Sequence, residues 1–154
     1  MSKAIGSLGE QLVSHWLENQ GWQILHHQWY CRYGEIDLIA LQRESKDLPI
    51  LSFVEVKTRS QRNWDQGGRL AITLSKQAKL IQSAELFLSD HPNFIQYSCR
   101  FDVALVRCDR YPHSASTTLF EDIPTFPNVI KVGQPFSLNG YRLLLQDYIE
   151  SAFS

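Results

Sequence analysis

Two short apolar segments separated by a polar connection constrain the fold of this chain more than any other feature. Residues 35–41 and 50–57 are rich in branched apolar side chains, whereas residues 42–49 are mostly polar and charged. This pattern predicts two antiparallel strands joined by a solvent-facing connection. Apolar side chains occupy both alternating faces of each strand, so other elements must cover both faces of the sheet. We therefore expect helices packed on a central sheet.

Two segments with helical periodicity supply that cover. In residues 6–20, Gly6 and Gly9 fall within the apolar stripe, where the missing side chains would let the helix approach its neighbour closely. Residues 73–89 form the second helix, which should end at Pro92. Further strands are predicted at residues 22–29 and 100–107. The resulting order is αβββαβ, a mixed α/β domain.

The C-terminal part is harder to assign. We expect a core over residues 1–108, with residues 109–154 extending the same domain. Three prolines within residues 109–128, namely Pro112, Pro124 and Pro127, predict an excursion loop there. Residues 128–132 are then expected to form a short edge strand, and residues 141–153 a closing helix.

Several classes of protein are excluded. The chain of 154 residues is 44% hydrophobic and 20% charged, which disfavours intrinsic disorder. No apolar run reaches the roughly 18 residues of a membrane span, and the N-terminal residues lack the apolar region of a signal peptide. The three cysteines form no CxxC pair, which argues against a disulfide framework or a zinc finger. We therefore expect a cytoplasmic protein.

Carboxylates interrupt the two apolar segments. Glu35 and Asp37 share one face of the first strand with apolar residues, and Glu55 and Lys57 share one face of the second. The expected register places Asp37 opposite Glu55. Carboxylates so close repel each other unless a positive group lies between them, and a divalent cation such as Mg²⁺ or Mn²⁺ suits hard oxygen ligands.

A purely structural alternative stays open for these side chains. Glu55 and Lys57 can form an ordinary ion pair, while Glu35 can pair with Arg32 or Lys57. For Asp102, which shares a strand face with Arg100, an ion pair is the favoured interpretation.

Basic residues follow the second strand. Between Lys57 and Lys79 the chain has six basic residues and one acidic residue, whereas its overall net charge is −1. This stretch is a candidate face for a polyanion, although a solvated helix start and loop would look the same. Trp64 within it could stack on an unpaired base or fold back on its own domain.

Four motifs in order resemble a known family. They are GSLGE at 6–10, GEIDLIA at 34–40, FVEVKTR at 53–59 and RFDVALV at 100–106. Together they resemble the small bacterial YraN-like family of the PD-(D/E)-x-K nuclease superfamily. The resemblance covers residues 5–107 and implies a restriction-endonuclease-like fold, related to archaeal Holliday junction resolvases. Ile36 precedes Asp37, so the proline that names the superfamily is absent.

The resemblance also implies roles for individual residues. Asp37, Glu55 and the carbonyl of Val56 would bind Mg²⁺ or Mn²⁺, and Lys57 would position or activate the attacking water. Glu10 would reach in from the first helix toward a second metal or a bridging water. The predicted nucleic-acid-binding residues are Arg59, Arg62, Arg69, Lys76 and Lys79.

These inferences favour a Mg²⁺-dependent endonuclease that acts on structured or branched DNA. A non-catalytic nucleic-acid-binding or adaptor module on the same fold is the alternative. A sugar hydrolase with paired carboxylates is a third possibility, which the neighbouring lysine and basic stretch disfavour. By analogy with two-fold DNA junctions, a homodimer is expected.

Overall fold

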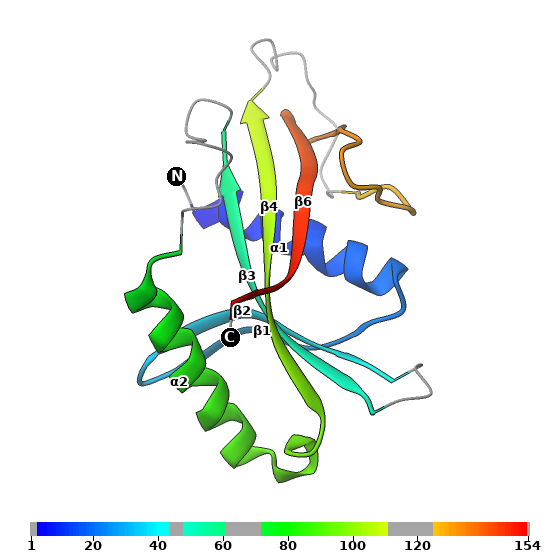
Figure 1. Ribbon diagram of the computed structural model, residues 1–154. Coiled ribbons are helices and arrows are strands. Elements are labelled where there is room, and N and C mark those ends of the chain that lie inside the picture. Colours follow the sequence, from blue (N-terminus) through cyan, green and yellow to red (C-terminus); the bar gives the residue numbers. More distant parts are fainter. Residues whose placement is uncertain (1–2, 44–47, 61–71, 111–124, 154) are drawn as a thin grey trace.

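The computed structural model describes residues 3–43, 48–60, 72–110 and 125–153 (Figure 1). Two long helices and a six-stranded sheet make up the described fold. A short 3₁₀ turn, Pro92–Phe94, follows the second helix. The long elements are α1 (Lys3–Asn19), β1 (Gln23–Cys31), β2 (Gly34–Gln42), β3 (Ile50–Arg59), α2 (Leu74–Asp90), β4 (Ser98–Arg110), β5 (Phe136–Leu138) and β6 (Tyr141–Phe153). The predicted αβββαβ order is confirmed, and the mixed sheet with two helices is consistent with a restriction-endonuclease-like fold.

The sheet has the strand order β1-β2-β3-β4-β6-β5. Strands β1, β2 and β3 form an antiparallel meander. Strand β4 runs parallel to β3, so the chain must cross over between them, and α2 makes that crossover. Strand β6 pairs antiparallel with β4 and, on its other side, with β5.

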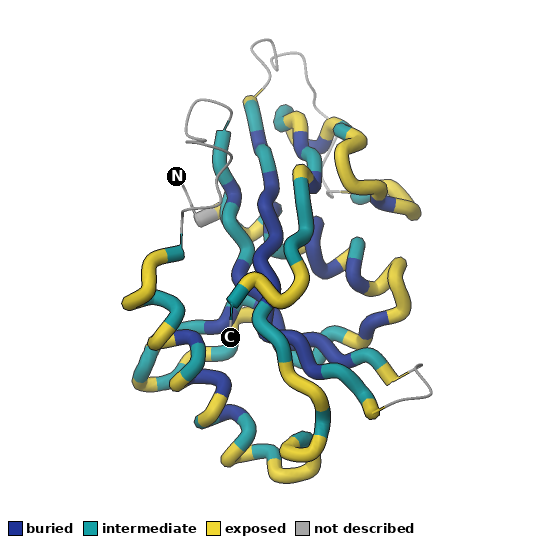
Figure 2. The backbone as a smooth tube through the Cα atoms, in the orientation of Figure 1, coloured by how far each residue is buried: buried dark blue, intermediate teal, exposed yellow. Residues whose placement is uncertain are grey.

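Each helix covers one face of the sheet. Helix α1 contributes Leu12, Val13 and Leu17 to a core with β2, β3, β4 and β6. Helix α2 contributes Leu80 and Phe87 to a second core on the other face. The middle strands are mostly buried, whereas exposed residues lie on the outer helix surfaces and at strand ends (Figure 2). The two apolar faces of the central strands are therefore each covered by one helix, as the sequence predicted.

Local sequence explains where α2 begins and ends. The side chain of Thr73 caps the helix by accepting a hydrogen bond from the Lys76 backbone N–H at 3.1 Å. The helix stops at His91, just before Pro92, as predicted.

The predicted closing helix over residues 141–153 is wrong, because this segment is strand β6. Its apolar residues fit both periodicities, but Leu143 and Leu145 alternate along the strand and are fully buried in the α1 core. Strand β4 would otherwise expose an unpaired edge.

The predicted edge strand at residues 128–132 is also wrong. Those residues form bends and a turn, because the Ile130 N–H donates to the side chain of Asn19 at the end of α1. The edge strand is β5, a few residues later.

Candidate active site

The site lies where β2 and β3 separate. Their ladder runs from Gln42–Ile50 to Leu38–Val54, and Asp37 and Glu55 are one step beyond, as the predicted register requires. Past this point β3 continues beside β4, while β2 turns away with β1 (Figure 1). Instead of a backbone pair, the Asp37 Oδ2 atom accepts a hydrogen bond from the Val56 N–H at 2.8 Å. A side chain thus holds the fork of the two strands together.

Three carboxylates meet at this fork. Glu10 on α1 and Glu35 and Asp37 on β2 each place an oxygen within 4.8 Å of the others. Glu35, for which the sequence left a pairing with Arg32 or Lys57 open, therefore belongs to the cluster.

Gly9 lets Glu10 reach the cluster. A side-chain carbon at Gly9 would collide with the side chain of Thr58 on β3, so the close contact of α1 with β3 requires glycine. The expectation for Gly9 is confirmed. The same expectation for Gly6 is wrong, because a Cβ there would meet no atom within 4 Å.

Burial makes the charges of these carboxylates unfavourable. Desolvation and the nearby Glu55 raise the pKa of Asp37 from 3.8 to about 8, although the hydrogen bond from Val56 lowers it. Desolvation also raises the pKa of Glu10 from 4.5 to about 7. At neutral pH the fork therefore retains protons that exposed carboxyl groups would lose.

Glu55 is buried beside the cluster but faces two lysines. Its Oε2 atom is 3.2 Å from the Lys57 ammonium and 3.7 Å from that of Lys76 on α2. The Lys57 side chain is 14% exposed and that of Lys76 is 44% exposed. The ion pair of Glu55 with Lys57 that the structural alternative allowed is present, and together with Lys76 it places two cations next to three carboxylates.

Gln28 on β1 is a site residue that sequence reasoning missed. It lies between His27 and Trp29, which pair with Leu38 and Ile36 of β2, and its backbone has a positive φ of 51°. Its side chain forms a hydrogen bond with Glu10 that lowers the pKa of that carboxyl. Left-handed backbone at a non-glycine residue is uncommon in a strand and gathers at functional sites. The sequence carries no signal for it, because glutamine is unremarkable there.

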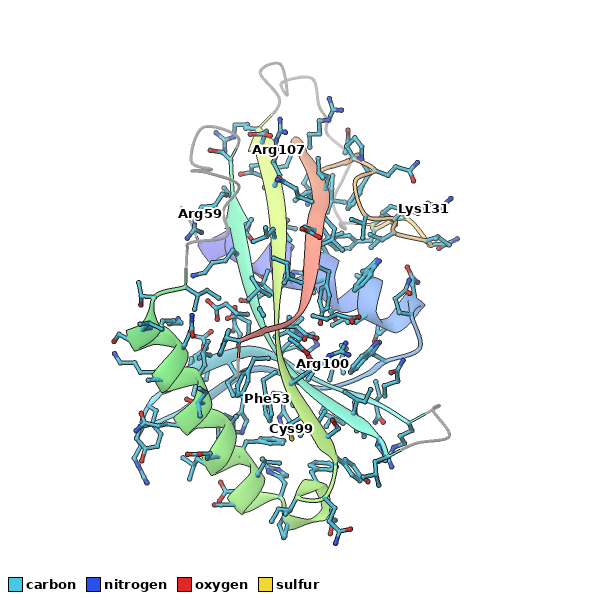
Figure 3. The ribbon with its side chains drawn as sticks, viewed as in Figure 1. Phe53, Arg59, Cys99, Arg100, Arg107 and Lys131 are labelled. Atoms are coloured by element: carbon cyan, nitrogen blue, oxygen red, sulfur yellow. The ribbon has the colours of Figure 1, made fainter. Side chains whose placement is uncertain are left out.

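The predicted cationic residues lie at different distances from the fork. Lys76 touches Glu55, and Lys79 lines a cavity of about 200 Å³ together with Tyr33, Glu35 and Lys76. Arg59 is at the far end of β3, where its guanidinium donates to the carbonyl of Thr58 (Figure 3). Three further residues predicted in this stretch lie outside the described residues: Arg62, Trp64 and Arg69.

Asp102 is a structural residue, as expected. It is fully buried and accepts hydrogen bonds from Ser52 at 2.6 Å, Tyr148 at 2.7 Å and Arg100 at 3.1 Å. These bonds tie β3, β4 and β6 together.

The donor set of the fork fits a divalent cation. Three carboxylate oxygens within 4.8 Å are the hard ligands that Mg²⁺ and Mn²⁺ prefer, and Glu10, Glu35 and Asp37 are the residues able to hold one. Val56 contacts Asp37 through its N–H, so the predicted role of its carbonyl stays a prediction, as does direct ligation by Glu55.

Known proteins similar to this chain share one family. Residues 9–106 match a family described as uncharacterised protein family UPF0102. The chain is 51% identical to a UPF0102 protein of Trichodesmium erythraeum, over 96% of this chain and 87% of that protein. It is 46% identical to a relative from Acaryochloris marina, over 97% and 90%. For a relative from Synechocystis the identity is 42%, over 97% of both chains. Neither described long helix has the length and apolar character needed to cross a membrane.

Proposed function

The chain belongs to the uncharacterised protein family UPF0102, whose name states no activity, and from its geometry we propose a divalent-metal-dependent endonuclease. The proposed reaction is hydrolysis of phosphodiester bonds in structured or branched DNA, with Mg²⁺ or Mn²⁺ as cofactor. The observation that carries the proposal is the cluster of Glu10, Glu35 and Asp37 within 4.8 Å, next to the lysine pair on Glu55.

The carboxylates support metal binding through their energetics. Asp37 has a pKa of about 8 because burial and neighbouring acids oppose its charge. A dication at the fork would remove that repulsion and displace the retained protons. Once bound, it would supply an activated water and neutralise charge on the phosphoryl oxygens.

The protein's own groups have distinct tasks in this proposal. The Val56 N–H fixes the Asp37 carboxylate, and Gly9 lets α1 present Glu10 from the opposite layer. The ammonium of Lys57, held 3.2 Å from Glu55, is a fixed cation for a developing phosphoryl charge. Lys76 is more exposed, and in this proposal it would contact an adjacent phosphate of the same strand.

Cleavage assays test the proposal directly. Wild-type protein is incubated with a four-way junction, a flap, a linear duplex and a single strand, each with Mg²⁺ or Mn²⁺. We expect metal-dependent cleavage by the wild type. Asp37→Asn and Lys57→Met should each reduce the cleavage rate by about 100-fold or more. Glu85→Gln changes an exposed acid on the outer surface of α2 and serves as the matched control with an unchanged rate.

Two results contradict the enzymatic proposal. One is equal cleavage by wild type and Asp37→Asn, and the other is no cleavage of any substrate by the wild type. In the second case, DNA binding that weakens with salt but requires no metal would favour the non-catalytic module.

A further inference from the structure

A second cavity lies on the α2 side of the sheet. Its volume is about 260 Å³, and it is lined by Ile72, Gln77, Val103, Ile149, Ala152 and Phe153. We name it the β6 pocket. Its walls come from the start of α2, the middle of β4 and the end of β6.

One lateral row of residues connects the fork to the β6 pocket. Glu55 pairs with Val103 on β4, and Val103 pairs with Ile149 on β6. Laterally paired side chains point to the same face, and neighbouring strands are about 4.8 Å apart. Ideal strand spacing would put Val103 and Ile149 about 5 and 10 Å from Glu55 along the row. Lys76, which contacts Glu55, is next to Gln77 of the pocket.

The end of β6 is built to close this pocket. Phe101 pairs with Phe153 and Val103 with Ile149, so β6 has two more residues than β4 over this interval. Ser151 within it has a positive φ of 50°, and its N–H donates to the buried Asp102 carboxylate at 2.9 Å. This bend carries the last residues of β6 across β4 on the side of α2 (Figure 1). The buried Asp102 carboxylate therefore fixes the strained bend that places the end of β6 at the edge of the β6 pocket.

The lining suits a flat ring with polar edges. Val103, Ile149 and Ile72 form apolar walls, and the ring of Phe153 is stacked on Phe101 with 5.0 Å between centroids. The Gln77 side chain is the polar group at the helix end, and its amide nitrogen donates to the Ile72 carbonyl at 3.2 Å. Its amide oxygen is an acceptor suited to the exocyclic amine of a base.

Resting on the endonuclease proposed above, we infer that the β6 pocket takes an unpaired nucleobase of the strand whose phosphate lies at the carboxylate fork. A base in a duplex is stacked and paired, so only an unpaired or extruded nucleotide can enter. The substrate class is then DNA with single-stranded character at the cleavage position, as in a flap or an open junction. Aromatic and apolar platforms bind bases in this way with little dependence on sequence.

Binding to matched oligonucleotides tests the inference without relying on cleavage. Fluorescence anisotropy is measured with Ca²⁺ on a labelled 12-nucleotide single strand and on the same strand with abasic residues. The two probes carry the same phosphates, so the electrostatic contribution cancels. We expect the wild type to bind the base-containing strand roughly 10- to 100-fold more tightly.

Two variants locate the effect in the β6 pocket. Ala152→Leu fills the pocket from an exposed position, and Gln77→Ala removes its polar group. Both should lose most of the preference for bases while keeping the affinity for the abasic strand. Gln82→Ala, an exposed change on the same helix, is the control and should keep the preference. Circular dichroism verifies that each variant is folded.

The outcomes separate this inference from the proposed function. Equal affinity for the two probes, no binding of either, or a preference that neither pocket variant reduces overturns the β6 pocket as a base site. If such a result accompanies metal-dependent cleavage of DNA, the endonuclease stands and only the pocket assignment falls. Base preference that the variants abolish, without any cleavage, supports the pocket and contradicts the endonuclease.

Discussion

Replacing Asp37 with asparagine should make the metal-free protein more stable. Asparagine has nearly the same shape and keeps an oxygen that can accept the Val56 N–H, but it carries no charge. In the wild type, burial and nearby acids raise the pKa of Asp37 from 3.8 to about 8. The folded protein must therefore keep a proton on Asp37 at pH values where the unfolded chain has released it.

The size of the effect follows from that difference in pKa. Between pH 3.8 and pH 7 the folded state binds up to one more proton than the unfolded state, which costs roughly 4 kcal/mol at about 1.36 kcal/mol per pH unit. Solvent contact and relaxation of the fork reduce this value, and we expect about 2 kcal/mol. The sign follows from the raised pKa: the contribution of Asp37 to the stability of the wild type becomes less favourable from pH 4 to pH 8 and is constant above pH 8.

Urea denaturation followed by tryptophan fluorescence measures this directly. The free energy of unfolding is determined at several pH values from 4 to 8.5 in the presence of a chelator. The advantage of Asp37→Asn should be near zero at pH 4 and largest above pH 8. Mn²⁺ should stabilise the wild type and leave the variant unchanged, because the cation binds only the folded carboxylate cluster. Asp90→Asn, an exposed change at the end of α2, should differ from the wild type by less than about 0.5 kcal/mol throughout.

A metal-free Asp37→Asn protein that is less stable than the wild type at pH 8 would refute the reasoning. So would a stability difference that does not grow with pH, because the predicted effect comes from a proton that only the folded state retains.

Three other changes test separate parts of the site and fold. Gly9→Ala should lower the free energy of unfolding by about 1–3 kcal/mol and weaken Mn²⁺ binding in calorimetry, because α1 must move away from β3. An unchanged stability and an unchanged Mn²⁺ affinity would contradict the close contact of the two elements. Gln28→Ala removes a hydrogen bond that lowers the pKa of Glu10, so that pKa should rise further above about 7. Mn²⁺ affinity should then fall at pH 7 and recover toward pH 8.5, where Glu10 loses its proton. An equal loss of affinity at both pH values would contradict this role of Gln28. Tyr148→Phe removes one donor from the buried Asp102 carboxylate and should cost about 1–3 kcal/mol in urea denaturation, whereas a neutral effect would show that the bond is dispensable.

Sequence periodicity was sufficient to predict the central strands, because composition and segment length both favour a strand there. The segments over β2 and β3 are rich in branched apolar residues, bounded by polar residues and too short for a long helix. A connection of fixed length then sets the register, which placed Asp37 one step beyond Leu38–Val54. Strand β6 had no such agreement, since its apolar residues match a helical stripe as well as alternation. Pairing with the otherwise open edge of β4 makes residues 141–153 a strand, and that pairing depends on the tertiary fold rather than on local sequence.

The candidate site was predictable to the extent that it follows from alternation along strands. The predicted register is confirmed up to the Leu38–Val54 pair, one step before Asp37 and Glu55, because lateral pairing is regular that far. Glu35 joins the cluster because the two strands separate there, which no local pattern encodes. Gln28 depends on a left-handed residue in β1, and such a conformation is invisible in a sequence that has no glycine at that position.

The row that crosses the sheet from Glu55 to Ile149 connects the two proposed sites. Its Glu55 end lies beside the separated strands, where carboxylates and lysines gather between α1 and α2. Its second half is apolar because β3, β4 and β6 stay paired, and the bend at Ser151 closes a cavity over them. A nucleotide has the same polarity, with an anionic phosphate at one end and a largely apolar ring at the other. Since the two halves of the row are only about two strand spacings apart, a single unpaired nucleotide matches both at once, whereas a base held in a duplex does not.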